Sequence, residues 1–283
     1  MEGIKAAVCQ LKVVEDKSAN IKKASEMIAG AAGNGARLVV LPEMFNCPYQ
    51  APLFPLYAET FPEGETFKML SAAARESKVY LAGGSLPERD GERVYNTSFI
   101  FGPDGNLLGR HRKVHLFDVE LPGGITVKES STLGAGERIT VVPTEFGPLG
   151  VAICYDIRFP ELIRLMALKG AKIIVVPAAF NMTTGPAHWD LVFRMRAVDN
   201  QLFVIAASPA RDVNAGYVAF GHSIMVDPWG EVLARAGHGE EVLTGELELA
   251  RIEKIRRELP LTAHRRTDLY QLRELADVPG DQV

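Results

Sequence analysis

The sequence predicts an α/β fold, a four-layer α-β-β-α sandwich with an internal pseudo-two-fold repeat. Short apolar runs alternate with amphipathic stretches along the chain, which indicates strands that alternate with helices. Residues 35–42 (GARLVVLP) recur as residues 170–177 (GAKIIVVP), and residues 98–105 (SFIFGPDG) recur as residues 223–230 (SIMVDPWG). Because each of two related sheets must cover both of its faces, we expect the sheets to pack face to face with helices outside. A single doubly wound sheet is the alternative.

Each predicted element follows from a local pattern. Residues 4–11 form an apolar run typical of a strand, and residues 20–32 carry a helical stripe of Ile21, Ala24, Ile28 and Ala31. The run 38–41 before Pro42 is apolar throughout, as in a strand covered on both faces. Further strands are expected at 80–84, 98–101, 147–155, 172–178, 203–207, 222–226 and 242–247, and further helices at 66–77, 159–168, 187–200 and 250–259. No linker interrupts the series, so we expect residues 1–283 to form a single domain.

Composition and charge argue against several function classes. The chain has 283 residues, of which 47% are hydrophobic and 23% charged, as is usual for a globular protein. A net charge of −4 without any run of lysine and arginine disfavours nucleic acid and anionic membranes as partners. The longest apolar run, residues 173–180, is too short to cross a bilayer, and the first residues lack a signal-peptide pattern. Three cysteines without a CxxC motif indicate free thiols in a reducing, cytoplasmic setting.

Cys154 stands at the end of an apolar run, in the segment GVAICYDIRFPE of residues 150–161. A strand that ended there would place the thiol at the carboxyl edge of a sheet, where α/β proteins bind ligands. Pro160 and Glu161 then have the pattern of a helix start, and nearby backbone N–H groups would favour the thiolate. Cys9, in mid-strand, has the surroundings of a buried structural thiol, and Cys47 is expected in a loop.

Glu43 is the best candidate for the base that a nucleophilic thiol needs. It follows the apolar run of the first half as Cys154 follows that of the second, so burial should raise its pKa toward the range of a general base. Lys113 adds a cation in the segment HRKVH of residues 111–115. An acid, a cation and a thiol together describe a catalytic site.

Histidines offer two other interpretations. His111 and His115 have the spacing of a metal pair, but the two cations between them and the lack of a cysteine cluster argue against zinc, and we expect no metal site. A Cys–His dyad that uses His188 or His222 stays open as an alternative.

The sequence resembles the nitrilase superfamily of carbon–nitrogen hydrolases in three places: Glu43 after an apolar strand, the segment RKVHL at residues 112–116, and the segment at residues 150–161. The likeness extends from the N-terminal strand to about residue 270 and implies the α-β-β-α sandwich. It also implies a catalytic triad of Glu43, Lys113 and Cys154, with Glu129 positioning the lysine and the Tyr155 N–H assisting. No metal or organic cofactor is expected, because an amide carbon is already electrophilic.

Residues 113–118, 180–189 and 207–212 are most similar to the omega-amidase branch of this superfamily. That likeness implies hydrolysis of the terminal amide of 2-oxoglutaramate and 2-oxosuccinamate to the 2-oxo dicarboxylate and ammonia, through a cysteine thioester. The Phe159-Pro160 pair also occurs in the sister branch that hydrolyses deaminated glutathione. That amidase, or another small-amide or carbamoyl hydrolase of the superfamily, is therefore the alternative. Family likeness also implies a homodimer.

An anionic substrate needs a cation, and Arg158 stands four residues after Cys154. A guanidinium binds a carboxylate through two parallel hydrogen bonds. The alternative role for Arg158 is a salt bridge to Asp156 or Glu161. By family likeness, the other residues of the substrate pocket are His115, Phe117, Tyr155, Phe180 and Thr184.

Overall fold

The computed structural model describes residues 3–121 and 125–275. The first sheet contains, in spatial order, β16 (Glu241–Leu247), β1 (Ile4–Gln10), β2 (Leu38–Val40), β4 (Tyr80–Ala82), β6 (Arg93–Phe101), β5 (Leu86–Asp90) and β3 (Glu59–Thr60), with β7 (Leu107–Arg112) beside β6. The second contains β10 (Thr140–Val142), β11 (Leu149–Val151), β12 (Ile173–Pro177), β13 (Phe203–Ala207), β14 (Ile224–Val226) and β15 (Val232–Arg235). A separate pair is formed by β8 (Asp118–Leu121) and β9 (Ile125–Lys128).

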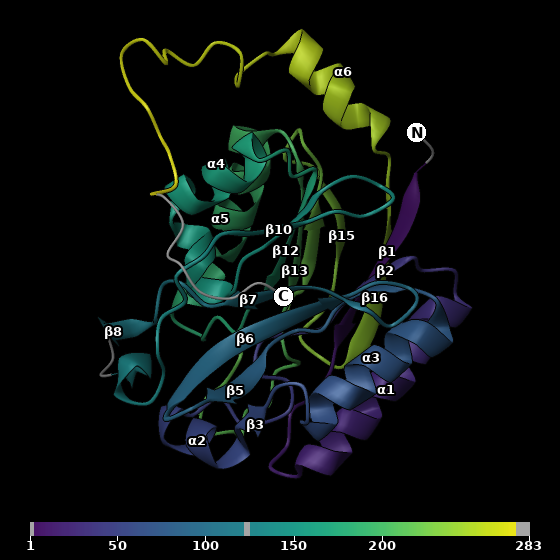
Figure 1. The fold of residues 1–283 in the computed structure, drawn as a ribbon, viewed down its shortest axis with the longest axis vertical. Coiled ribbons are helices and arrows are strands. Elements are labelled where there is room, and N and C mark those ends of the chain that lie inside the picture. The colour runs from purple at the N-terminus through teal and green to yellow at the C-terminus, as the bar shows by residue number, and fades with distance from the viewer. Residues whose placement is uncertain (1–2, 122–124, 276–283) are drawn as a thin grey trace.

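Helices cover the outer face of each sheet (Figure 1). Those on the first sheet are α1 (Lys17–Gly33) and α3 (Glu65–Ser77), and those on the second are α4 (Pro160–Leu168) and α5 (Thr184–Asn200). The remaining helical segments are α2 (Phe54–Tyr57), α6 (Ala250–Glu258) and the short 3₁₀ helices η1 (Ala51–Leu53), η2 (Glu129–Ser131) and η3 (Cys154–Arg158). The predicted four-layer sandwich is confirmed, and the single doubly wound sheet is wrong.

The predicted repeat is visible in the topology. In the first sheet β1, β2 and β4 run parallel and β6 is antiparallel to β4. In the second sheet β11, β12 and β13 run parallel and β14 is antiparallel to β13. The repeated segments occupy equivalent strands of the two sheets. Residues 35–42 contain β2, and the matching residues 170–177 contain β12. Residues 98–105 contain the end of β6, and the matching residues 223–230 contain β14.

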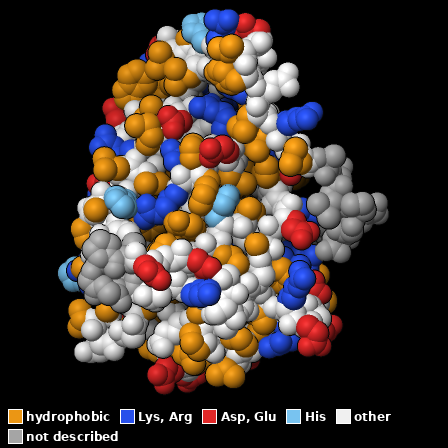
Figure 2. Space-filling model, turned by 90° about the vertical axis from the view of Figure 1, so that its left-hand side faces the viewer, with side chains coloured by type: hydrophobic (Ala, Val, Ile, Leu, Met, Phe, Trp, Pro, Cys, Tyr) orange, Lys and Arg blue, Asp and Glu red, His pale blue; other side chains and the backbone are white. Residues whose placement is uncertain are grey.

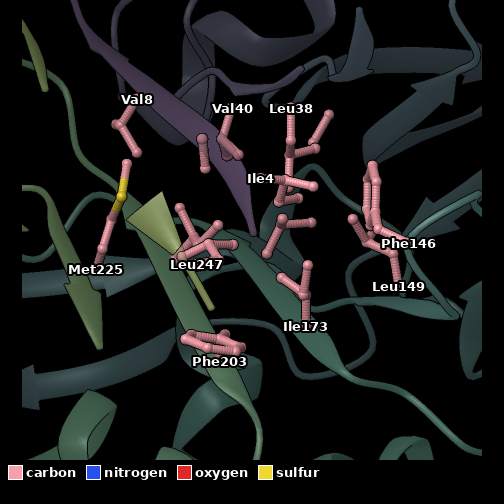
Figure 3. Packing of buried hydrophobic residues seen from close by; sticks show 14 of the residues in the cluster. Ile4, Val8, Leu38, Val40, Phe146, Leu149, Ile173, Phe203, Met225 and Leu247 are labelled. Carbon is pink, nitrogen blue, oxygen red and sulfur yellow. The ribbon is translucent and has the colours of Figure 1, made fainter. Parts of the chain in front are cut away.

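Both faces of the central strands are buried, which explains why they are apolar throughout. Along β12, Ile173 and Val175 belong to the core between the sheets, whereas Ile174 and Val176 belong to the core under α4 and α5. Figure 3 shows the inter-sheet core, where Val8, Val40 and Leu38 of the first sheet lie opposite Met225, Phe203 and Ile173 of the second. This core fixes how the strand ends of the two sheets face each other.

Strands β5 and β7 were not predicted, and the departure closest to the site lies before Cys154. We expected a strand over residues 147–155, but β11 ends at Val151 and Cys154 begins η3. The cause is local, because the Asp156 side chain accepts a hydrogen bond from the Ile153 N–H at 3.0 Å and turns the chain. Cys154 has a φ of +47°, in the left-handed region, which ends the extended backbone.

None of the helices in residues 3–121 and 125–275 combines the length and the apolar character that crossing a membrane requires. On the face shown in Figure 2, side chains of both charges are interspersed with hydrophobic ones.

Candidate active site

The structure brings Glu43, Lys113, Glu129 and Cys154 together at the carboxyl ends of the central strands. The Lys113 Nζ donates to Glu43 Oε1 and to Glu129 Oε1, each at 2.9 Å, and all three side chains are fully buried. The Cys154 thiol lies close enough to the Glu43 carboxylate for each group to change the pKa of the other. The acid and the thiol come from opposite sheets, since Glu43 follows β2 and Cys154 follows β11.

The two oxygens of Glu43 have different surroundings. Oε1 accepts hydrogen bonds from Lys113 Nζ and from Asn96 Nδ2, both at 2.9 Å. Oε2 is buried and has no hydrogen-bond partner among the described residues. Burial raises the pKa of Glu43, and the nearby Lys113 ammonium reduces this rise. One oxygen is therefore held in place while the other is available to accept a proton.

Lys113 stays charged although it is fully buried. Burial alone would lower its pKa, but the carboxylates of Glu129 and Glu43 raise it above the ordinary value. Glu129 is itself fixed, because its Oε1 accepts from the Tyr49 hydroxyl and its Oε2 from the Phe117 N–H, both at 2.7 Å. The ammonium is thus a rigid, permanent positive charge beside the thiol.

The Cys154 thiol is 5% exposed and its pKa lies well above the ordinary value. Burial is the main cause, and the Glu43 carboxylate adds to it, while Lys113 and the Ala179 N–H act in the opposite direction. A backbone N–H group does favour the thiolate, as expected, but burial outweighs its effect on the pKa in the resting site. The thiol is protonated at neutral pH and needs a base to react.

Asp156 is a central residue that sequence reasoning considered only as a partner of Arg158. Its Oδ1 accepts from the backbone N–H of His115 at 2.8 Å and contacts His115 Nδ1 at the same distance. Its Oδ2 accepts from the Ile153 N–H and lies 3.2 Å from His111 Nε2. The two histidines with metal-like spacing therefore bind a carboxylate instead. The contacts connect the segment that carries Lys113 to the turn that carries Cys154.

Arg158 has no acidic partner among the described residues, so the predicted alternative of a salt bridge to Asp156 or Glu161 is wrong. Its guanidinium lies over the Phe180 ring, with Cζ 4.5 Å from the ring centroid, and its Nη1 is 3.1 Å from His188 Nδ1. Burial lowers its pKa, and the Cys154 thiol is the nearest group that counteracts this effect. A half-buried cation without a counter-ion thus lies near the thiol.

Aromatic rings surround this cation and the thiol. The His115 ring stacks on Phe159 with centroids 3.6 Å apart, and the Tyr155 ring meets Phe117 and Phe159 edge-on at 5.1 and 5.2 Å. The predicted pocket residue Thr184 is buried at the start of α5, where its hydroxyl donates to Asn181 Oδ1 at 3.0 Å. Its hydroxyl is therefore already used in holding the helix start.

The described contacts do not support the Cys–His alternative. His188 pairs with Arg158, and His222 Nδ1 lies 3.1 Å from the carbonyl oxygen of Ala236. Neither histidine is among the groups that affect the pKa of Cys154. Glu43 is the carboxylate that lies beside the thiol and can accept its proton.

Comparison with known proteins agrees with this geometry. The carbon–nitrogen hydrolase family model matches residues 5–257. The omega-amidase NIT2 of Homo sapiens is 49% identical over 270 residues, which cover 95% of this chain and 98% of that protein. The chloroplastic omega-amidase of Arabidopsis thaliana is 51% identical over 94% of this chain and 73% of its own length. Among solved structures, the fold is similar to that of Saccharomyces cerevisiae Nit3, a member of branch 10 of the nitrilase superfamily, with a TM-score of 0.86 and 46% sequence identity. The aligned region covers 94% of this chain and 97% of the Nit3 chain. The chain belongs to the carbon–nitrogen hydrolase family, within the nitrilase superfamily.

Proposed function

We propose that this protein is an omega-amidase, which hydrolyses the terminal amide of 2-oxoglutaramate and 2-oxosuccinamate to the 2-oxo dicarboxylate and ammonia. The observation that carries the proposal is the contact of Glu43, Lys113 and Cys154 in a buried site. An arginine that has no acidic partner in the described part of the chain lies near them. Similarity to curated omega-amidases over nearly the whole chain supports the substrate class.

The first half of the proposed reaction forms a thioester. Glu43 accepts the thiol proton as the Cys154 sulfur attacks the amide carbon, which overcomes the raised pKa of the thiol. In this proposal the resulting oxyanion is stabilised by the Lys113 ammonium and by the Tyr155 N–H, which lies in the first turn of η3, where backbone N–H groups lack a partner within the helix. Removing one such donor typically costs about 3 kcal/mol in the barrier. Protonated Glu43 then gives its proton to the leaving nitrogen, the carbon–nitrogen bond breaks, and ammonia departs.

The second half hydrolyses the thioester. Glu43 takes a proton from water as the water oxygen attacks the acyl carbon. The carbon–sulfur bond then breaks, the acid is released, and protonated Glu43 returns its proton to the sulfur, which regenerates the thiol. Lys113 keeps its charge throughout, since the carboxylates of Glu129 and Glu43 raise its pKa above the ordinary value. In this proposal Glu43 is the only group that gains and loses protons besides the thiol.

Arg158 is the proposed anchor for the substrate carboxylate. Its guanidinium is half-buried, lacks an acidic partner among the described residues and lies near the thiol. A carboxylate would form two parallel hydrogen bonds with it. Phe117, Tyr155 and Phe180 would then line the space between the anchor and the reacting amide, with His115 behind Phe159.

Ammonia release from a panel of substrates tests the proposal. We expect 2-oxoglutaramate to be hydrolysed much faster than deaminated glutathione, glutamine and a simple nitrile, and the Cys154→Ala variant to be inactive. A strong preference for deaminated glutathione would reject the omega-amidase assignment and retain the chemistry. Activity in Cys154→Ala would reject both.

We also propose that the protein is a cytoplasmic homodimer. Leu191 and Met195 on α5 are 69% and 51% exposed, which is consistent with a covered surface in an assembly. All three cysteines are buried and unpaired, which fits a reducing compartment. Light scattering that reports only monomer would contradict the dimer, and secretion of the protein would contradict the compartment.

A further inference from the structure

Tyr217 borders both the opening of the site and the nucleophile. A cavity of about 270 Å³ leads from exposed residues, among them Gln50, to the buried carboxylate of Glu43, and Tyr217 forms part of its wall. The Tyr217 ring packs against that of Tyr49, with centroids 4.5 Å apart. Burial raises the pKa of Tyr217 well above its ordinary value, and the nearby Cys154 and Glu43 add to this effect. A substrate that reaches Glu43 through this cavity therefore passes Tyr217.

The hydroxyl of Tyr217 donates a hydrogen bond to the carbonyl oxygen of Ala179. Ala179 comes shortly after β12, and its neighbours Ala178 and Phe180 pack with Cys154 in the core under α4 and α5. The Ala179 N–H donates to the Cys154 sulfur and favours the thiolate, against the burial that raises the pKa of this thiol. One residue thus contacts Tyr217 through its carbonyl and the nucleophile through its N–H.

Ala179 lies beyond the end of β12, so the ladder of the sheet does not hold it in place. Its carbonyl is held by Tyr217, and the next carbonyl, that of Phe180, accepts from the Phe220 N–H at 2.7 Å. Each peptide group is planar, and the two that meet at the Ala179 Cα can rotate only about the bonds to that atom. A fixed Ala179 carbonyl therefore restricts the rotation that would turn the Ala179 N–H away from the sulfur.

We propose that the Tyr217 hydroxyl is a positioning group for the nucleophile, which keeps the Ala179 N–H on the Cys154 sulfur while that sulfur carries negative charge. The inference rests on the proposed thioester mechanism, in which the sulfur becomes charged twice. It does so as Glu43 removes the thiol proton, and again as the bond to the acyl carbon breaks. A hydrogen bond to a charged acceptor is stronger than one to a neutral acceptor, so the N–H assists both steps. The Tyr217 hydroxyl itself keeps its proton throughout.

The Tyr217→Phe variant tests the proposal, because it removes the hydroxyl and keeps the ring beside Tyr49. The matched control is Tyr57→Phe, which also removes a hydroxyl that donates to a backbone carbonyl, that of Glu15, at 2.8 Å. The activated ester 4-nitrophenyl acetate acylates thiols without needing recognition, so its burst reports acylation and its steady rate reports deacylation. We expect Tyr217→Phe to slow both about tenfold, and the pH profile of the burst to move up by about one pH unit, which is the same factor.

Kinetics with 2-oxoglutaramate should show a lower kcat, about tenfold, and a KM within threefold of wild type, because the ring still lines the cavity and Arg158 is unchanged. The ester reports on Tyr217 even if 2-oxoglutaramate is not the substrate, so the two proposals can fail separately. Burst and steady rates equal to those of Tyr57→Phe would overturn the positioning role. Slower rates with an unmoved pH profile would overturn it too, since the hydroxyl would then only support the fold. A raised KM with unchanged ester rates would instead make the hydroxyl a substrate contact, and would equally reject the proposal.

Discussion

At the scale of single residues, the site depends on the unequal oxygens of Glu43. Oε1 is held by Lys113 and Asn96, and Oε2 has no partner among the described residues, so the carboxylate keeps its position while it exchanges protons. Burial raises its pKa and also that of the Cys154 thiol, so the proton passes between two groups that are both poorly solvated.

The Glu43→Gln variant should lose most of the activity. An amide of the same shape can still contact Lys113 and Asn96 but cannot accept the thiol proton, so we expect kcat/KM to fall by about 100-fold to 10,000-fold. Ammonia release measures this loss, and circular dichroism checks the fold. Glu161→Gln, at an exposed carboxylate, serves as the control. Full activity in Glu43→Gln, combined with a loss in His188→Ala or His222→Ala, would contradict the assignment.

The raised pKa of Glu43 predicts the acid side of the pH profile. The base works when it is deprotonated, so kcat/KM should rise with pH as Glu43 loses its proton. Because burial raises this pKa above the ordinary glutamate value of 4.5, the rise should be centred above pH 4.5. The measurement is kcat/KM for the best amide substrate between pH 4 and pH 9, on enzyme shown to stay folded. A rise centred at or below pH 4.5 would show that the carboxylate is solvated.

The Arg158→Met variant should separate recognition from chemistry. Loss of the guanidinium removes the proposed partner of the substrate carboxylate, and we expect KM for 2-oxoglutaramate to rise about 10-fold to 100-fold. The deacylation rate with 4-nitrophenyl acetate, which has no carboxylate, should change less than threefold. Equal losses with both substrates would indicate that Arg158 supports the fold of the site instead.

Sequence reasoning predicted three side chains that the structure brings together, but missed most of the residues that hold them. Glu43 and Cys154 could be predicted because each follows an apolar run, and Lys113 because its segment, residues 112–116, resembles that of the nitrilase superfamily. The roles of Asn96 and Tyr49 could not be predicted, because they arise from hydrogen bonds to distant segments. Asn96 is 53 residues from its partner Glu43, and Tyr49 is 80 residues from its partner Glu129. No local pattern reveals such pairs.

At the scale of elements, one buried carboxylate connects two of the segments that carry the site. Asp156 on η3 contacts Ile153 in its own turn and both His111 and His115 across the gap between the sheets. Burial would raise its pKa, but the hydrogen bonds from the two histidines prevail and hold the pKa well below the usual range. The negative charge of Asp156 therefore stabilises the placement of Lys113 relative to Cys154.

Asp156→Asn should destabilise the protein in a pH-dependent way. A carboxylate with a lowered pKa contributes stability above its unfolded pKa of about 4, and this contribution is lost as the pH falls below that value. We expect the free energy of unfolding of the variant to be about 2–4 kcal/mol lower than that of the wild type at pH 7. This difference should shrink as the pH falls from about 5 to about 3. Urea denaturation at each pH measures it. A gap that stays constant over this range would mean that the charge of Asp156 does not contribute.

The turn at Asp156 also explains where element prediction failed. The repeat and the buried strands could be predicted, because strands covered on both faces are apolar throughout and the two halves repeat them. The end of β11 could not be predicted, because the apolar pattern continues to Ile153. The backbone turns before that point, where the Asp156 side chain accepts a hydrogen bond from the Ile153 N–H. Strands β8 and β9 were missed because they are short and carry mixed polar residues.

At the scale of the whole molecule, the packing between the sheets sets the position of the base relative to the nucleophile. Glu43 follows a strand of the first sheet and Cys154 follows a strand of the second, so the two side chains are connected through the inter-sheet core. Phe203 on β13 is among the largest side chains in this core and is 1% exposed (Figure 3). Close packing means that a lost ring leaves a cavity or shifts the sheets.

Phe203→Ala should weaken both stability and the site. Truncating a buried phenylalanine typically costs about 3–5 kcal/mol, whereas Leu56→Ala, at a side chain that is 77% exposed, should cost less than about 0.5 kcal/mol. Urea unfolding measures both values. At a temperature where the Phe203→Ala variant remains folded, we expect acylation by 4-nitrophenyl acetate to slow, because the two sheets no longer hold Glu43 and Cys154 at a fixed separation. Acylation as fast as in Leu56→Ala, despite the full loss of stability, would show that the strand ends keep their geometry without the inter-sheet core.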